Sequence, residues 1–161
     1  HPCPFAKVPF EQYRIRYVEE KSGIIEDIIT TSLREWKYLA AHPEIETTLL
    51  IVTHGLQDFE DYLYTLSILQ EALRLAQLEG VPQIASFHPD YQFEGTNIHD
   101  LSNYTNRSPY PIFHFLRETS VQWAVESHPN TEAIPDQNIA RLEALGMEEI
   151  KRRLNDLNGA Y

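Results

Sequence analysis

A histidine and an aspartate stand two residues apart in the segment Ser86–Phe93, where a short apolar stretch gives way to polar residues. Imidazole exchanges protons near neutral pH, and a neighbouring carboxylate can orient it. The pair predicts acid/base catalysis, with His88 as the acid or base and Asp90 as the group that orients it. The alternative is structural, with His88 bonding a loop carbonyl at the end of a strand and Asp90 forming an Asx turn.

Asn106 and Arg107 come just before Ser108 and Pro109, a pair typical of a helix start because serine caps the helix and proline fits its first turn. A guanidinium beside the positive end of a helix suits a bound anion. We therefore predict that Asn106, Arg107 and the downstream Arg117 bind an anionic ligand. The alternative is that Arg107 only ties the loop to a nearby carboxylate, since proline removes N–H donors from the first turn.

His114 and Glu118 are four residues apart in a segment after Pro111 whose apolar spacing predicts a helix. On a helix the two side chains face the same way, and His88 would complete a set of two histidines and one carboxylate suited to Zn or Fe(II). A metal-dependent hydrolase or oxygenase is therefore an alternative function. The favoured explanation is an ordinary solvated helix face, and we predict no metal and no other cofactor.

Alternating strand and helix patterns must position these residues. The segments Tyr13–Glu19, Thr47–Thr53 and Val81–Phe87 have the apolar patterns of strands, and the second reads as a central strand covered on both faces. Apolar residues at helical spacing run from Gly23 to near His42, and from Asp58, a plausible N-cap, to Gly80. Helices that alternate with strands favour parallel pairing.

The carboxyl ends of parallel strands meet at one edge of a sheet, and ligands in open α/β sheets bind outside that edge. We therefore predict that His54, His88 and Arg107 converge on one pocket there. The 24-residue stretch from His88 to Pro111 has no helical or strand periodicity. Ordered loops of this length are uncommon unless they have a function.

Helical patterns return from about Ser108, and again over Pro135–Leu145 and Met147–Leu157. The predicted fold is a single α/β domain over residues 1–161. It has a small three-stranded, mainly parallel sheet, flanking helices and a helical C-terminal region. A ferredoxin-like α+β arrangement is the alternative.

The charge balance excludes some partners. The 161 residues include 13 Lys and Arg against 24 Asp and Glu, a net charge of -11. Such a surface repels phosphate backbones and anionic lipids, so we expect neither nucleic-acid nor membrane binding. Cys3 is the only cysteine, which rules out an intrachain disulfide and favours the reducing cytoplasm. Its thiol, with Lys7 nearby in sequence, is a further candidate nucleophile, and buried packing is the alternative.

Several short phrases together resemble one protein family. They are Cys3–Ala6, Thr47–Leu50, Gln57–Phe59, Ser86–Phe93, Asn103–Pro111, His114 with Arg117 and Glu118, and Ile134–Gly146. The combination is similar to the bacterial domain of unknown function 1415. This resemblance implies a bacterial, cytoplasmic protein, and it supplies no activity or catalytic residue.

The leading functional hypothesis is a small enzyme that acts on an anionic, for example phosphorylated, small molecule. In it His88 and Asp90 are catalytic, and His54, Asn106, Arg107 and Arg117 bind the ligand. The alternative from another class is a non-catalytic ligand-binding or protein-interaction module whose polar loop is a recognition surface. Association into a homo-oligomer is compatible with both.

Overall fold

The computed structural model describes residues 9–76, 83–127 and 133–158. Along the chain it has β1 (Ile15–Glu20), α2 (Ile25–Ala41), β2 (Thr47–Val52), α3 (Phe59–Ala76), β3 (Gln83–Phe87), the 3-10 helix η1 (Leu101–Thr105), β4 (Ile112–Leu116), α4 (Glu118–Ser127), α5 (Ile134–Leu145) and α6 (Met147–Asn158). Within these ranges no helix is long and apolar enough to cross a membrane.

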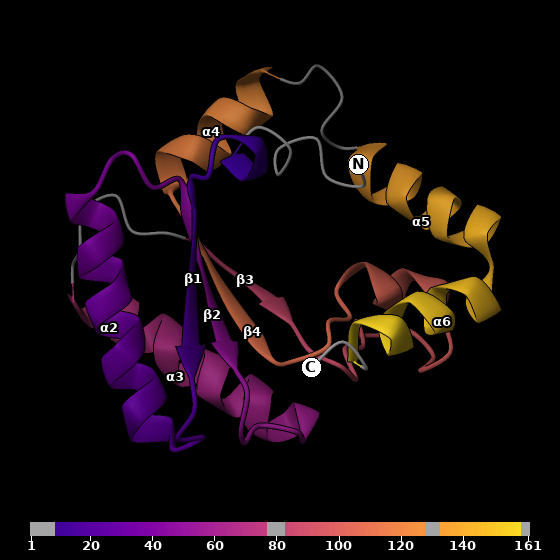
Figure 1. Cartoon of the computed structure of the whole chain (residues 1–161), viewed down its shortest axis with the longest axis horizontal. Helices are drawn as coiled ribbons and strands as arrows, with labels where there is room; N and C mark the ends of the chain where they lie inside the picture. The colour runs from indigo at the N-terminus through magenta and orange to yellow at the C-terminus, as the bar shows by residue number, and fades with distance from the viewer. Residues whose placement is uncertain (1–8, 77–82, 128–132, 159–161) are drawn as a thin grey trace.

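The four strands form one mixed sheet in the order β1-β2-β4-β3. β1 and β2 are parallel, whereas β4 is antiparallel to both of its neighbours. The predicted α/β class with flanking helices is confirmed, but the three-stranded, mainly parallel sheet is wrong. The succession of elements also differs from the ferredoxin-like alternative, which follows β-α-β-β-α-β. Because β2 and β3 both oppose β4, they run in the same direction and their carboxyl ends lie at the same edge (Figure 1).

The segment after Pro111 is the strand β4, where the sequence predicted a helix. Its residues alternate, with Phe113 and Phe115 fully buried and Ile112, His114 and Leu116 half-buried on the other face. The short apolar run fits a helix turn and a strand equally well when it is taken alone. The segment forms a strand because it pairs with β2 on one side and β3 on the other. These pairings give hydrogen-bond partners to the backbone N–H and C=O groups on both sides of β4.

The hydrophobic core lies between the sheet and the helices α2 and α3, which cover the same face (Figure 1). Trp36 of α2 meets Phe115 edge-on at 5.1 Å, and Tyr62 of α3 stacks on Phe113 at 4.8 Å between ring centroids. The other fully or nearly fully buried apolar residues of this core are Ile28, Leu39, Leu50, Val52, Leu56, Leu69 and Leu73. We call this side of the sheet its inner face.

The opposite, outer face of the sheet is only partly covered. Leu49 and Ile51 of β2 are half-buried there, and Tyr17 of β1 is 57% exposed. The sequence predicted a central strand covered on both faces; β2 is an interior strand with a buried inner face, and its outer face is covered in part. Figure 1 shows α5 and α6 on the outer side but set apart from the strands, while α5 packs against η1.

Two glycine turns touch at the carboxyl edge of β1 and β2. Gly23 has a φ of 65° and Gly55 a φ of 81°, which are backbone conformations that favour glycine. A Cβ atom on Gly55 would lie 2.8 Å from the Cα of Gly23. This close approach fixes the turn His54–Gln57, which leads to the predicted site.

Candidate functional site

His88 is completely buried directly after β3. The N–H of Asp90 donates to Nδ1 at 3.0 Å, so the proton of the neutral ring is on Nε2, which donates to the carbonyl of Leu56 at 2.9 Å. The ring also packs against Phe59 and Tyr62, with centroid distances of 5.1 and 5.2 Å. Both ring nitrogens are therefore engaged within the fold.

Asp90 and His54, which were predicted to act together with His88, have different surroundings from it. The side chain of Asp90 is exposed, and its contact with His88 is made by the backbone N–H. His54 is also exposed, with Nδ1 3.3 Å from the hydroxyl oxygen of Thr53. Leu56, two residues after His54, is the hydrogen-bond partner of His88, which places the turn and His88 at the same sheet edge.

Arg107 is bonded to the loop itself. Its Nε donates to the carbonyl of Tyr91 at 3.2 Å, and its Nη2 donates to the carbonyl of Ile98 at 2.8 Å. The guanidinium carbon also lies 4.3 Å from the centre of the Tyr104 ring. These contacts hold two separate stretches of the loop together.

Asn106 makes a second link between the ends of the loop. Its side-chain Nδ2 donates to the backbone carbonyl of Ser86 at 3.0 Å. The backbone carbonyl of Asn106 accepts the N–H of His88 at 3.2 Å. The predicted residues His88, Asn106 and Arg107 are thus brought together, through bonds to loop backbone.

Asn103 is a central residue of the loop that sequence reasoning missed. It is completely buried, and its Oδ1 accepts bonds from the N–H of Phe93 and the hydroxyl of Thr96 at 3.0 and 2.9 Å. Its Nδ2 donates to the carbonyl of Asn97 at 2.8 Å. The only signal in the sequence was the density of Asn, Asp and Thr, which favour such local bonds.

Arg117 lies at the other edge of the sheet. It follows Leu116, which pairs with Thr47 at the start of β2. Its guanidinium donates to the carbonyls of Ile45, His42 and Leu39, and so closes the end of α2. Arg107 and Arg117 are therefore not brought together as two sides of one anion site.

The alternative metal set also does not assemble. His114 is on the outer face of β4, whereas His88 packs on the inner side against α3, and Glu118 is exposed at the start of α4. In the part of the chain that the structure describes, no group of three His, Cys, Asp or Glu side chains is placed to hold a metal ion. Cys3 and Lys7 lie outside the described residues.

His114 has a defined environment that the predicted helix concealed. Its Nε2 is 2.6 Å from the hydroxyl oxygen of Thr47, which in turn donates to the carbonyl of Phe115 at 2.7 Å. Burial lowers the pKa of His114 from 6.5 to about 4. The imidazole is therefore neutral at physiological pH.

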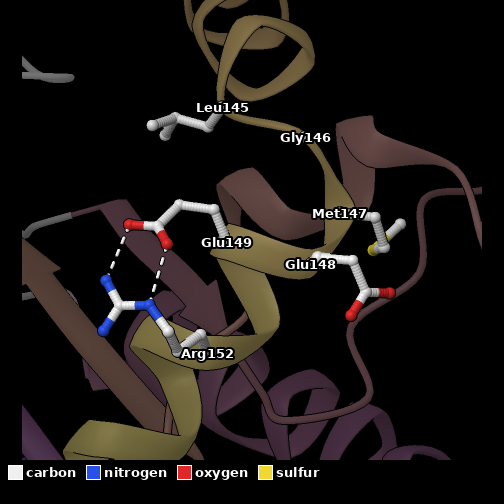
Figure 2. Close-up of a pocket in the computed structure, with 6 residues that line it drawn as sticks. All are labelled: Leu145, Gly146, Met147, Glu148, Glu149 and Arg152. Atoms are coloured by element: carbon white, nitrogen blue, oxygen red, sulfur yellow. Dashed lines mark hydrogen bonds and ion pairs between the residues drawn. The ribbon is translucent and has the colours of Figure 1, made fainter.

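A separate pocket of about 610 Å³ lies at the turn between α5 and α6, lined by Leu145, Gly146, Met147, Glu148, Glu149 and Arg152. Figure 2 shows the carboxylate of Glu149 facing the guanidinium of Arg152. Two hydrogen bonds of 2.8 Å join them, and Arg153 also donates to Glu149. The charges of this pocket are thus largely paired within α6.

The comparison with known families agrees with the resemblance in the sequence. Residues 1–152 match the family described as protein of unknown function DUF1415. The chain belongs to this family. No curated protein and no solved structure matches the chain.

In this DUF1415 protein, two of the phrases that carried the resemblance meet in space. The segment Ser86–Phe93 begins the long loop and Asn103–Pro111 ends it. They are joined by the bonds of Asn106 to Ser86 and His88 and by the bond of Arg107 to Tyr91. The family phrases thus include the residues that give the loop its shape.

Proposed function

We propose that this DUF1415 protein is a non-catalytic interaction module whose loop 88–111 is a preformed surface for a protein partner. The observation that carries the proposal is that the polar side chains of the loop are hydrogen-bonded within the fold. The side chains of His88, Asn103, Asn106 and Arg107 all bond to backbone of the loop, of β3 or of the turn His54–Gln57. The hydrogen bonds of these side chains therefore stabilise the conformation of the loop.

Catalysis by His88 is less compatible with this arrangement. A general acid or base must come within hydrogen-bond reach of a substrate proton. The ring of His88 is completely buried, and a substrate could reach either nitrogen only after a bond to Leu56 or Asp90 was broken. The anion clamp meets a similar difficulty, because Arg107 already donates to two carbonyls.

The outward side of the loop carries apolar side chains among carboxylates. Phe93 is 37% exposed and Ile98 is 51% exposed, and the side chains of Asp90, Glu94 and Asp100 are also exposed. Asn103 fixes the backbone at Phe93, and Arg107 fixes it at Ile98. A surface ordered before binding loses less conformational entropy when a partner docks.

This surface fits a partner segment that carries both apolar and basic side chains. Lys or Arg residues on the partner complement the three carboxylates, and an apolar residue covers Phe93 or Ile98. A second copy of this chain is a poor fit, because both copies would bring the same carboxylates and the chain has a net charge of -11. The partner is therefore a different, basic protein.

A random peptide library displayed on phage tests the proposal. The wild-type protein should enrich peptides that combine Lys or Arg with apolar residues, with affinities that fall as salt screens the charges. The double variant Phe93→Ser, Ile98→Ser should enrich none of them. Tyr64→Ser is the matched control, because Tyr64 is 62% exposed and belongs to α3, outside the loop segment 88–111. Enrichment of the same peptides by the double variant, or no enrichment by the wild type, would overturn the proposal.

A further inference from the structure

One row of residues crosses all four strands on the outer face of the sheet. The register aligns Tyr17 of β1, Leu49 of β2, His114 of β4 and Ala85 of β3. Ile112 and Leu116 are the outward neighbours of His114 along β4, and both are half-buried. An imidazole is thus set in an apolar surface, which is the usual composition of a small-molecule site.

The bonds of Thr47 fix which nitrogen of His114 carries the proton. A threonine hydroxyl has one proton, and Thr47 donates it to the carbonyl of Phe115 at 2.7 Å. The 2.6 Å contact with His114 is therefore a bond in which Nε2–H donates to the threonine oxygen. In the neutral ring, Nδ1 then keeps its lone pair, and no hydrogen bond to it is present among the described residues.

From this geometry we infer a binding site for an uncharged small molecule with a flat apolar body and one O–H or N–H group. The donor group bonds to Nδ1 of His114, and the apolar body lies on the row formed with Leu49 and Ala85. Ala85, the neighbour of His114 on β3, has the smallest side chain of this row. The site is on the other face from the core and does not depend on the loop surface proposed above.

The outward positions of the paired strands carry no positive charge that would bind an anion. The outward positions of the paired strands are Ile15, Tyr17, Glu19, Thr47, Leu49, Ile51, Gln83, Ala85, Phe87, Ile112, His114 and Leu116, with no lysine or arginine among them. Burial keeps His114 neutral above a pKa of about 4, so it offers a lone pair and no positive charge. A base with such a low pKa can accept a hydrogen bond from a donor group at neutral pH. It is too weak to abstract a proton efficiently.

Three matched probes test the ligand class: 4-methylphenol, 4-methylanisole and 4-methylbenzoate. Binding to the wild-type protein with ¹⁵N-labelled histidine is followed by NMR at pH 7. We expect 4-methylphenol to bind saturably below about 10 mM and to shift the Nδ1 resonance of His114. The ether, which lacks the donor, and the carboxylate anion should bind at least about fivefold more weakly. No saturable binding of 4-methylphenol, or equal binding of the ether, would overturn the inference.

Variants locate the site and separate binding from folding. His114→Phe keeps an aromatic ring but loses the acceptor, and Ala85→Leu keeps the acceptor but puts a bulky side chain next to it in the row. Each should weaken 4-methylphenol binding about tenfold. Thr47→Ser keeps the hydroxyl and should bind as the wild type does. Thr47→Val should change the ¹⁵N pattern of the free imidazole, because the hydroxyl no longer fixes the proton on Nε2.

Each variant is first checked for the wild-type amide spectrum, and only folded variants are compared. Because His114→Phe and Ala85→Leu change different strands, either folded variant is sufficient. Unchanged affinity in a folded variant of either kind would place the probe elsewhere and refute the site. Loss of peptide binding by the loop would leave this result unaffected, so the two proposals fail separately.

Discussion

The imidazole of His88 holds the backbone of Leu56, 32 residues earlier in the chain, through a hydrogen bond of 2.9 Å. Leu56 has a φ of 53°, a left-handed conformation that residues other than glycine adopt infrequently. Such a conformation persists when its surroundings determine it strongly. His88 and the buried side chain of Leu56 supply those contacts, and together they turn the chain from β2 into α3.

Replacing His88 with alanine should therefore destabilise the whole fold. The change leaves a cavity beside Phe59 and Tyr62 and leaves the Leu56 carbonyl without its donor. We expect the free energy of unfolding to fall by about 3 kcal/mol, measured by urea denaturation. His54→Ala is the control and should leave stability unchanged, because His54 is exposed. A loss below about 1 kcal/mol in His88→Ala would contradict the structural role of the ring.

Two glycines with similar backbone angles should respond differently to alanine. Gly55 has a φ of 81°, and a Cβ atom there would lie 2.8 Å from the Cα of Gly23. Gly95 has a φ of 76°, and a Cβ atom there would meet nothing within 4 Å. We expect Gly95→Ala to cost only the left-handed backbone penalty, about 1 kcal/mol, and Gly55→Ala to cost clearly more. Equal losses in chemical denaturation would show that the two turns are not held in contact.

The local elements were largely predictable from the sequence because their patterns are periodic. The strands at Ile15–Glu20 and Thr47–Val52 and the helix Ile25–Ala41 follow the expected spacing within a few residues. The shared edge of β2 and β3 was also predicted correctly. The strand β4 was not, because a five-residue apolar run after two prolines becomes a strand only through its pairing with β2 and β3.

The same limit applies to the candidate site. The sequence located the loop and its chemistry-bearing residues, but it cannot show which groups those residues bond. Arg107 was predicted to bind an anion or a carboxylate, and its partners are the carbonyls of Tyr91 and Ile98. Backbone carbonyls have no sequence signature, since every residue carries one.

Arg107→Lys tests whether this residue stabilises the loop. A lysine keeps the charge but loses the planar fork that reaches both carbonyls. We expect the melting temperature to fall by about 3 to 6 °C, which corresponds to the loss of about 1.5 kcal/mol in a domain of this size. Arg74→Lys is the matched control, because the guanidinium of Arg74 bonds to the exposed carboxylate of Glu71 on its own helix. An unchanged melting temperature in Arg107→Lys would favour a role in binding an anion.

The buried His114 should make stability depend on pH over a defined range. Its pKa is 6.5 when unperturbed and about 4 in the fold, because burial disfavours the charged imidazole. The unfolded chain therefore takes up this proton at a higher pH than the native protein does. The contribution to stability is complete above pH 6.5 and is lost as the pH falls from 6.5 towards 4.

The loss reaches about 3 kcal/mol at the acid end of this range, from about 1.4 kcal/mol per pKa unit. His114→Phe has no titrating group and should lose less stability over the same range. Subtracting its unfolding free energies from those of the wild type removes the pH dependence that comes from the carboxylates and the other histidines. The difference should change steadily between pH 6.5 and 4 and stay constant from pH 7 to 8. Parallel curves for the two proteins would mean that His114 titrates normally, and so is not the neutral acceptor that the outer-face site requires.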